Sequence, residues 1–102
     1  MKKRKFVINP TIDLEHGHVS IEVDLGTMGN DFTLFVAHMI NDTNQFNTVS
    51  VDGHVIHMTI ASFEVDDLES RINLIRDSIV YWYQKIDVLN ECIRSIDRVY
   101  FV

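Results

Sequence analysis

Residues 46–61, FNTVSVDGHVIHMTIA, carry the strongest local signal in the chain, because Asp52-Gly53 lies between two stretches rich in β-branched residues. An Asp-Gly pair is typical of a two-residue type I′ turn, which needs a positive φ at both central residues. The pattern predicts a β-hairpin with strands over 46–51 and 54–61. An antiparallel sheet is therefore expected at the centre of the fold.

A long helix is predicted after this hairpin, because no Gly or Pro occurs from Ser62 to residue 102. From Leu68 to Ile96 the apolar residues recur in steps of four and three, which is the spacing of one helix face. Ser62 and Asp66 are both suitable N-caps. We expect the helix to cover about residues 66–97.

The same spacing is that of a coiled-coil heptad, with β-branched residues at successive a positions. A helix of about 32 residues is about 48 Å long, whereas a domain of this size has a radius of gyration of about 13 Å. We therefore expect a helix that packs partly on its own sheet and partly against a second copy, in a homodimer. The alternative is a helix that bends or breaks near residues 84–87 and folds back within a monomer. The expected dimer interface consists of Ile72, Ile75, Ile79, Trp82, Ile86, Leu89 and Ile93.

The first half of the chain has the same order of elements. Residues 3–9 form a short apolar strand that Asn9-Pro10 is expected to end, and 13–18 form a loop. Residues 18–25 alternate between apolar and polar side chains, as in a strand with one buried face. Residues 31–42 could be a buried strand, but the apolar spacing favours a helix with Asn30 or Asp31 as its N-cap.

These elements predict an α+β fold in the order ββα-ββα, with a small antiparallel sheet, one short helix and one long C-terminal helix. One domain over 1–102 is expected, in two parts: a hairpin plus short helix over about 1–44, and a hairpin plus long helix over about 45–102.

Charge is distributed unevenly along the chain. The formal net charge is −6, yet no Lys or Arg occurs from Phe6 to Ser70, a stretch that holds eleven Asp and Glu residues. Soluble proteins usually intersperse both signs. A simple solubility bias would explain this pattern, and so would a surface shaped for a basic partner. The acidic residues expected to bind that partner are Glu22, Asp24, Asp52, Glu64, Asp66 and Asp67.

Little in the sequence favours catalysis or a bound cofactor. There is no Gly-rich phosphate loop and no Gly-x-Ser-x-Gly turn. Cys92 lies among apolar positions of the predicted helix and is expected to be a small packing residue. One hypothesis is a metal-dependent enzyme that uses His16, His18 and His57. A zinc site needs three or four convergent ligands, so solvated histidines are the simpler interpretation. We predict no catalytic residues, no metal and no cofactor.

The sequence also bears on partners and location. Affinity for phosphate comes from Lys and Arg, so direct nucleic-acid binding is not expected. No apolar run approaches the length of a membrane span, and the basic residues 2–5 lack the apolar stretch of a signal peptide. A single cysteine suits a reducing compartment. We expect a cytoplasmic protein.

Two functional hypotheses follow. In the first, the protein is a small acidic binding protein, an inhibitor of the anti-defence or immunity type, whose carboxylates mimic nucleic acid and block a basic, nucleic-acid-handling partner. In the second, it is a non-enzymatic structural or assembly subunit that oligomerises through its long helix, and the acidity only keeps it soluble.

Overall fold

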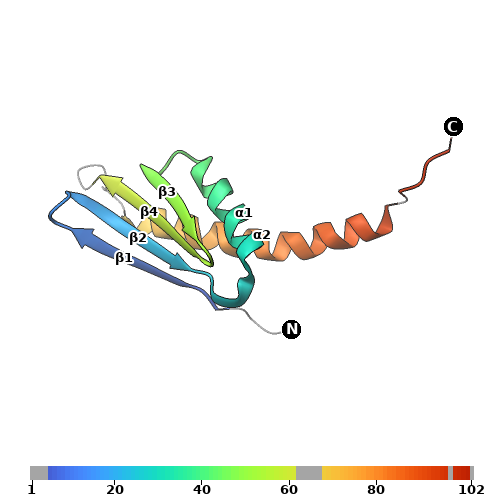
Figure 1. Cartoon of the computed structure of the whole chain (residues 1–102), viewed down its shortest axis with the longest axis horizontal. Coiled ribbons are helices and arrows are strands. Elements are labelled where there is room, and N and C mark those ends of the chain that lie inside the picture. Colours follow the sequence, from blue (N-terminus) through green and yellow to red (C-terminus); the bar gives the residue numbers. More distant parts are fainter. Residues whose placement is uncertain (1–4, 62–67, 97, 102) are drawn as a thin grey trace.

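Two hairpins and two helices make up the computed structural model, which describes residues 5–61, 68–96 and 98–101. The elements confirm the expected α+β fold, with each hairpin followed by a helix (Figure 1). In chain order they are β1 (Val7–Asp13), β2 (His18–Asp24), the short 3-10 helix η1 (Gly26–Met28), α1 (Asn30–Asn41), β3 (Thr48–Asp52), β4 (Val55–Ala61) and α2 (Leu68–Ser95).

The four strands form one antiparallel sheet in the order β1-β2-β4-β3, so the two hairpins meet through β2 and β4. These two central strands have the most regular alternation in the chain. Their inward side chains are Val19, Ile21 and Val23 from β2 and Ile56, Met58 and Ile60 from β4, and all six are buried. Because side chains alternate across a strand, the opposite face of the sheet is polar.

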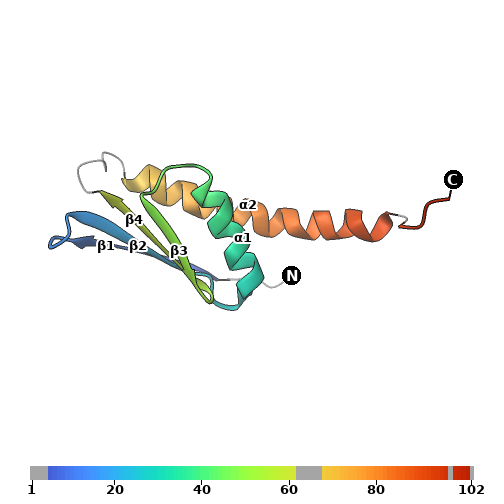
Figure 2. The ribbon, with the colours of Figure 1, turned by 45° about the horizontal axis from the view of Figure 1, so that its top comes forward.

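Both helices cover the same face of the sheet (Figure 2). The α1 helix contributes Phe32, Val36 and Ile40 to the core, and α2 contributes Ile75 and Ile79. These residues share one stripe on each helix, because they recur at the helical period. Burial of each such side chain stabilises the fold by about 1.5–3 kcal/mol relative to exposure.

The first strand differs from its expected bounds, since β1 continues through Asn9-Pro10 to Asp13. Pro10 is tolerated because β1 is an edge strand, where a missing N–H can face solvent. The register pairs Pro10 with Ile21 and Asp13 with His18. Asp13 therefore ends a strand instead of beginning a loop.

The start of α1 also differs, because neither Asn30 nor Asp31 is the N-cap. The cap position is Gly29, with a φ of 100° and a ψ of 150°, and glycine has no side chain that could cap the helix. Its carbonyl accepts two hydrogen bonds from the buried Thr33, one from the backbone N–H at 3.1 Å and one from the hydroxyl at 2.8 Å. The first of these is the ordinary first hydrogen bond of the helix, and the second adds a side-chain bond to the same carbonyl.

The turn between β3 and β4 lies one residue later than expected. Asp52 pairs with Val55, so the two loop residues are Gly53 and His54. Only Gly53 has a positive φ, at 62°. A glycine at the first central position is typical of a type II′ turn, and the expected type I′ turn is wrong.

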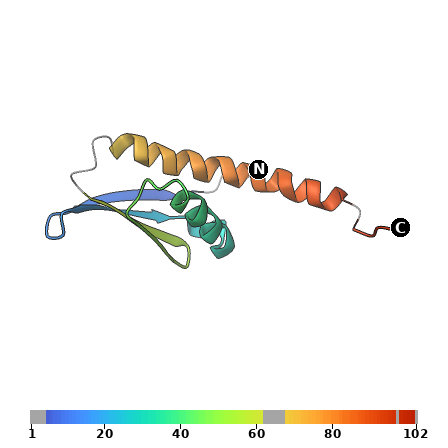
Figure 3. The same cartoon turned by 90° about the horizontal axis from the view of Figure 1, so that it is seen from above.

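The second helix is continuous from Leu68 to Ser95, so the alternative with a break near residues 84–87 is wrong. Its N-terminal half lies along the sheet and α1, and its C-terminal half projects beyond them (Figure 3). The molecule measures 62 × 33 × 23 Å with a radius of gyration of 16.6 Å, larger than expected for a compact chain of this length. Neither described helix has an apolar stretch long enough to cross a lipid bilayer.

Candidate functional site

The sheet face that the helices leave uncovered is the strongest candidate site, and we call it the open face. Its side chains come from alternate positions of all four strands. One row across the sheet contains Asn9, Glu22, His57 and Ser50, and the next contains Thr11, Ser20, Thr59 and Thr48. The face is a polar surface.

Three of the predicted acidic residues lie on this face. Asp24 and Asp52 both pair with Val55, from opposite sides of β4, so the two carboxylates are in one row. One strand separates them, which places their backbones about 10 Å apart. Glu22 lies two positions from Asp24 on β2, about 6.6 Å away. All three side chains are exposed.

The Asp24 carboxylate contacts two residues close to the end of β2. Its Oδ1 accepts a hydrogen bond of 2.8 Å from the Gly26 backbone N–H and lies 3.5 Å from His54 Nε2. The Leu25 N–H, next along the chain, donates to the His54 carbonyl at 2.9 Å. This bond fastens the end of β2 to the turn that follows Asp52.

No cation balances these carboxylates within the sheet. Apart from Lys5, which precedes β1, every Lys and Arg that the structure describes lies at residue 71 or beyond, on α2 or after it. The helix and the open face are on opposite sides of the sheet. The structure therefore keeps the described cations away from the open face, whereas α2 carries both signs, as in the Arg94–Glu91 ion pair of 3.0 Å.

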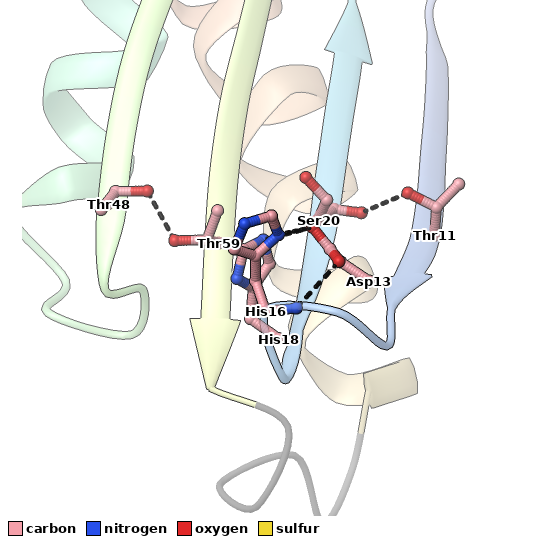
Figure 4. A network of polar contacts seen from close by, with 7 residues as sticks. All are labelled: Thr11, Asp13, His16, His18, Ser20, Thr48 and Thr59. Atoms are coloured by element: carbon pink, nitrogen blue, oxygen red, sulfur yellow. Dashed lines mark hydrogen bonds and ion pairs between the residues drawn. The ribbon is translucent and has the colours of Figure 1, made fainter.

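Asp13 is a further carboxylate that the sequence analysis missed. At the tip of the β1-β2 hairpin, its Oδ2 accepts a hydrogen bond of 2.8 Å from His16 Nδ1, and its Oδ1 accepts one of 3.1 Å from the His16 backbone N–H (Figure 4). These two bonds, the backbone bond above all, hold the pKa of Asp13 below its ordinary value of 3.8. His18 Nε2 lies 3.5 Å from the same carboxylate. A signal was present, because polar residues alternate with Ile8 and Ile12 up to Asp13.

Two hydroxyl contacts complete the face. The hydroxyls of Thr48 and Thr59 lie 2.6 Å apart and share a hydrogen bond, and Thr11 donates to the Ser20 carbonyl at 3.5 Å (Figure 4). These residues leave the middle of the open face polar but uncharged, between the Asp13 end and the Glu22 end.

The histidines of the metal hypothesis are not brought together. His16 and His18 stack with ring centroids 5.8 Å apart at the hairpin tip. His57 faces Glu22, four positions further along β2 than His18, or about 13 Å away. Within residues 5–61, 68–96 and 98–101, no three His, Cys, Asp or Glu side chains are placed to hold a metal ion.

Cys92 is exposed near the end of α2, so within the single chain it is not the small packing residue that was expected. Its place along the helix explains this exposure, because Cys92 lies in the half of α2 that projects beyond the sheet. Glu64, Asp66 and Asp67, which were expected to bind the partner, lie outside the described residues.

Comparison of the chain with protein-family models, with curated proteins and with solved structures gives no match.

Proposed function

We propose that this protein is a small cytoplasmic binding protein whose open face docks a basic, nucleic-acid-handling protein and blocks it. The observation that carries the proposal is the one-signed charge of this face. Glu22, Asp24 and Asp52 lie within one small area, and no described strand contains a Lys or Arg.

The spacing and form of the carboxylates support a protein partner. Side chains at alternate strand positions are about 6.6 Å apart, which is the order of the spacing between successive charges along a nucleic-acid strand. A groove that holds phosphates would meet a similar row of negative charge here.

Electrostatic attraction of this kind acts mainly on the rate of association and is screened by salt. Capture of partners from a cell lysate, at low and at high salt, tests the proposal. We expect basic proteins to be retained at low salt and released as the salt concentration rises. Retention of acidic proteins, or retention that salt does not weaken, contradicts it.

A matched pair of charge reversals makes this test specific. The triple change of Glu22, Asp24 and Asp52 to Lys should abolish capture. The same change in net charge at Glu69, Asp77 and Glu91, which are exposed on α2, should preserve it. Equal loss in both variants would mean that only the net charge matters.

The second candidate is an assembly subunit that oligomerises through α2, and the exposed apolar side chains at the end of this helix favour it. Under this alternative the triple reversal on the open face leaves biological activity unchanged in an oligomer that still assembles. The two functions are therefore separated by one variant.

A further inference from the structure

The projecting half of α2 exposes the continuation of the helix's own core-facing stripe. Ile75 and Ile79 on this stripe are fully buried in the chain's own core, so the dimer interface expected from the sequence cannot include them. Further along, Leu89 is 40% exposed, Ile93 47% and Ile96 54%. A contiguous exposed apolar row of this kind marks an association surface.

A groove of about 820 Å³ lies where α2 leaves the body of the molecule, between α2 and the start of α1. Its apolar lining includes Phe32 and Phe35 from α1 and Tyr83 and Ile86 from α2. Two exposed carboxylates, Asp31 and Asp87, stand at the same groove. The apolar row of α2 begins directly at this groove, so the two form one surface.

We propose that a second copy of this chain covers this surface, with the two α2 helices antiparallel about a two-fold axis near Glu91. Heptad packing then places Leu89 against Ile93 of the partner subunit and Ile86 against Ile96 of the partner subunit. Each contact occurs twice, as in any two-fold dimer.

The position of the sheet favours an antiparallel over a parallel pairing of the two α2 helices. The sheet and α1 lie on one side of α2 (Figure 3). The exposed row continues the helix stripe that packs on them, so it faces the same side. In a parallel pair, both sheets would have to fit between the two helices and would collide. In an antiparallel pair, each sheet lies beyond the C-terminal end of the other helix.

The antiparallel arrangement also brings the segment after α2 to the partner's groove. Tyr100 and Phe101 are 78% and 91% exposed, and Arg98 precedes them. An apolar segment with one cation complements a groove with an apolar lining and two carboxylates. In the structure the same segment points away from the groove of its own chain (Figure 1).

The groove is lined by ten residues, and Leu89, Ile93, Ile96 and residues 98–101 add seven more. A standard specific interface uses about 20–30 residues a side, so this surface is slightly smaller than the standard size. The inference does not depend on the proposed function, because it uses no residue of the open face.

Sedimentation equilibrium of the full chain at tens of micromolar tests the association. We expect a mass of twice 11.9 kDa. Ile93→Asp should raise the dissociation constant at least about a hundredfold, since the change enters the interface twice. Val88→Asp is the matched control: Val88 is 54% exposed on the same half of α2 but off the stripe, and this variant should remain dimeric.

Circular dichroism of both variants should match that of the unchanged chain, because neither side chain is in the core. A monomer of the unchanged chain overturns the proposal, including the case in which the segment folds back into its own groove. A dimer that Ile93→Asp leaves intact overturns it equally, since another surface then forms the contact.

Thiol cross-linking tests the orientation. The antiparallel pairing places Cys92 close to Cys92 of the partner subunit across the axis, whereas a parallel pairing puts them on opposite sides of the contact. A short bis-maleimide should therefore give a covalent dimer in the unchanged chain and in Val88→Asp, but not in Ile93→Asp. Absence of the cross-link in a proven dimer overturns the antiparallel arrangement.

A charge swap tests the groove. Asp87→Arg and Arg98→Asp should each weaken the dimer about three- to fivefold at low salt, and the double variant should restore it. If the double variant is weaker than both single variants, Arg98 does not meet the groove, and this part of the proposal is wrong.

Discussion

Asp13 is the residue whose ionisation the fold changes most clearly. Two hydrogen bonds from His16 stabilise the carboxylate form, so folding lowers the pKa of Asp13. A lowered pKa contributes stability above the unfolded value near 4, and this contribution is lost as the pH falls through the folded value. Asp13→Asn should therefore reduce the free energy of unfolding at neutral pH, and the difference from the unchanged chain should vanish as the pH falls below about 4.

Urea unfolding of both proteins between neutral and acid pH measures this difference, and an NMR titration of the Asp13 carboxyl measures the pKa itself. Asp52→Asn is the control, since it removes a carboxylate from the same face without removing the bonds from His16. A carboxyl that titrates at or above 3.8 would contradict the hydrogen-bonded geometry.

Gly29 is a second residue with a direct consequence for stability. Its φ of 100° with ψ of 150° lies in a region that side-chain-bearing residues rarely adopt. A Cβ at this position would meet no atom within 4 Å, so the penalty is one of backbone strain. Gly29→Ala should destabilise the protein by about 1–3 kcal/mol.

Chemical denaturation of Gly29→Ala beside Gly17→Asn checks this estimate. Gly17 has a φ of 67°, a left-handed conformation that Asn tolerates, so the second variant should lose much less stability. Equal losses of stability in the two variants would mean that a positive φ alone determines the loss, whatever region of backbone conformation the residue occupies.

At the scale of the elements, α2 is one helix with two environments. Ile79 is fully buried in the first half and Ile93 is 47% exposed in the second. Ile79→Ala should lower the free energy of unfolding by about 2–5 kcal/mol, because it leaves a cavity in the core. Ile93→Ala should change it by less than about 0.5 kcal/mol when the protein is dilute enough to be monomeric.

The comparison uses one residue type, one substitution and one helix, so helix propensity cancels. Thermal or urea unfolding at low concentration supplies both values. A large loss at Ile93 under these conditions would show that its side chain is buried within the monomer, contrary to the structure.

Local patterns predicted most of these elements, because the residues that form each pattern all lie within the element that it predicts. The alternation of β2 and β4 and the four-three spacing of α2 are examples. Two features depended on context instead. Pro10 can continue β1 only because that strand is at the edge, and the turn after Asp52 follows from the register with Val55. Neither feature can be predicted from the residues of the segment alone.

At the scale of the whole molecule, the candidate site was predicted in part. Alternation within β2 was enough to place Glu22 and Asp24 on one face. Asp52 was expected at the same surface from its charge alone, and its place in one row with Asp24 depends on the pairing of β4 with both β2 and β3, which no local pattern predicts. The predicted dimer interface includes Ile75 and Ile79, which the chain's own core buries, because a heptad pattern does not state which half of a helix its own sheet covers.

The overall shape yields the last prediction, which concerns the assembled protein. The monomer is 62 Å long, and the sheet occupies one end of it. An antiparallel dimer in which the two helices overlap over about residues 86–96, or about 15 Å at about 1.5 Å per residue, should be much longer than the monomer, with a sheet at each end. A parallel dimer would keep nearly the length of the monomer.

Small-angle X-ray scattering measures this maximum dimension directly, and the Ile93→Asp variant gives the monomer value under the same conditions. A dimer that scatters as a particle close to 62 Å long would contradict the antiparallel arrangement.

The elongated form has a consequence for binding, because it holds two open faces far apart. Each acidic face then remains accessible, so a dimer should bind two basic partners at once, and Ile93→Asp should halve the number bound per particle without weakening either contact.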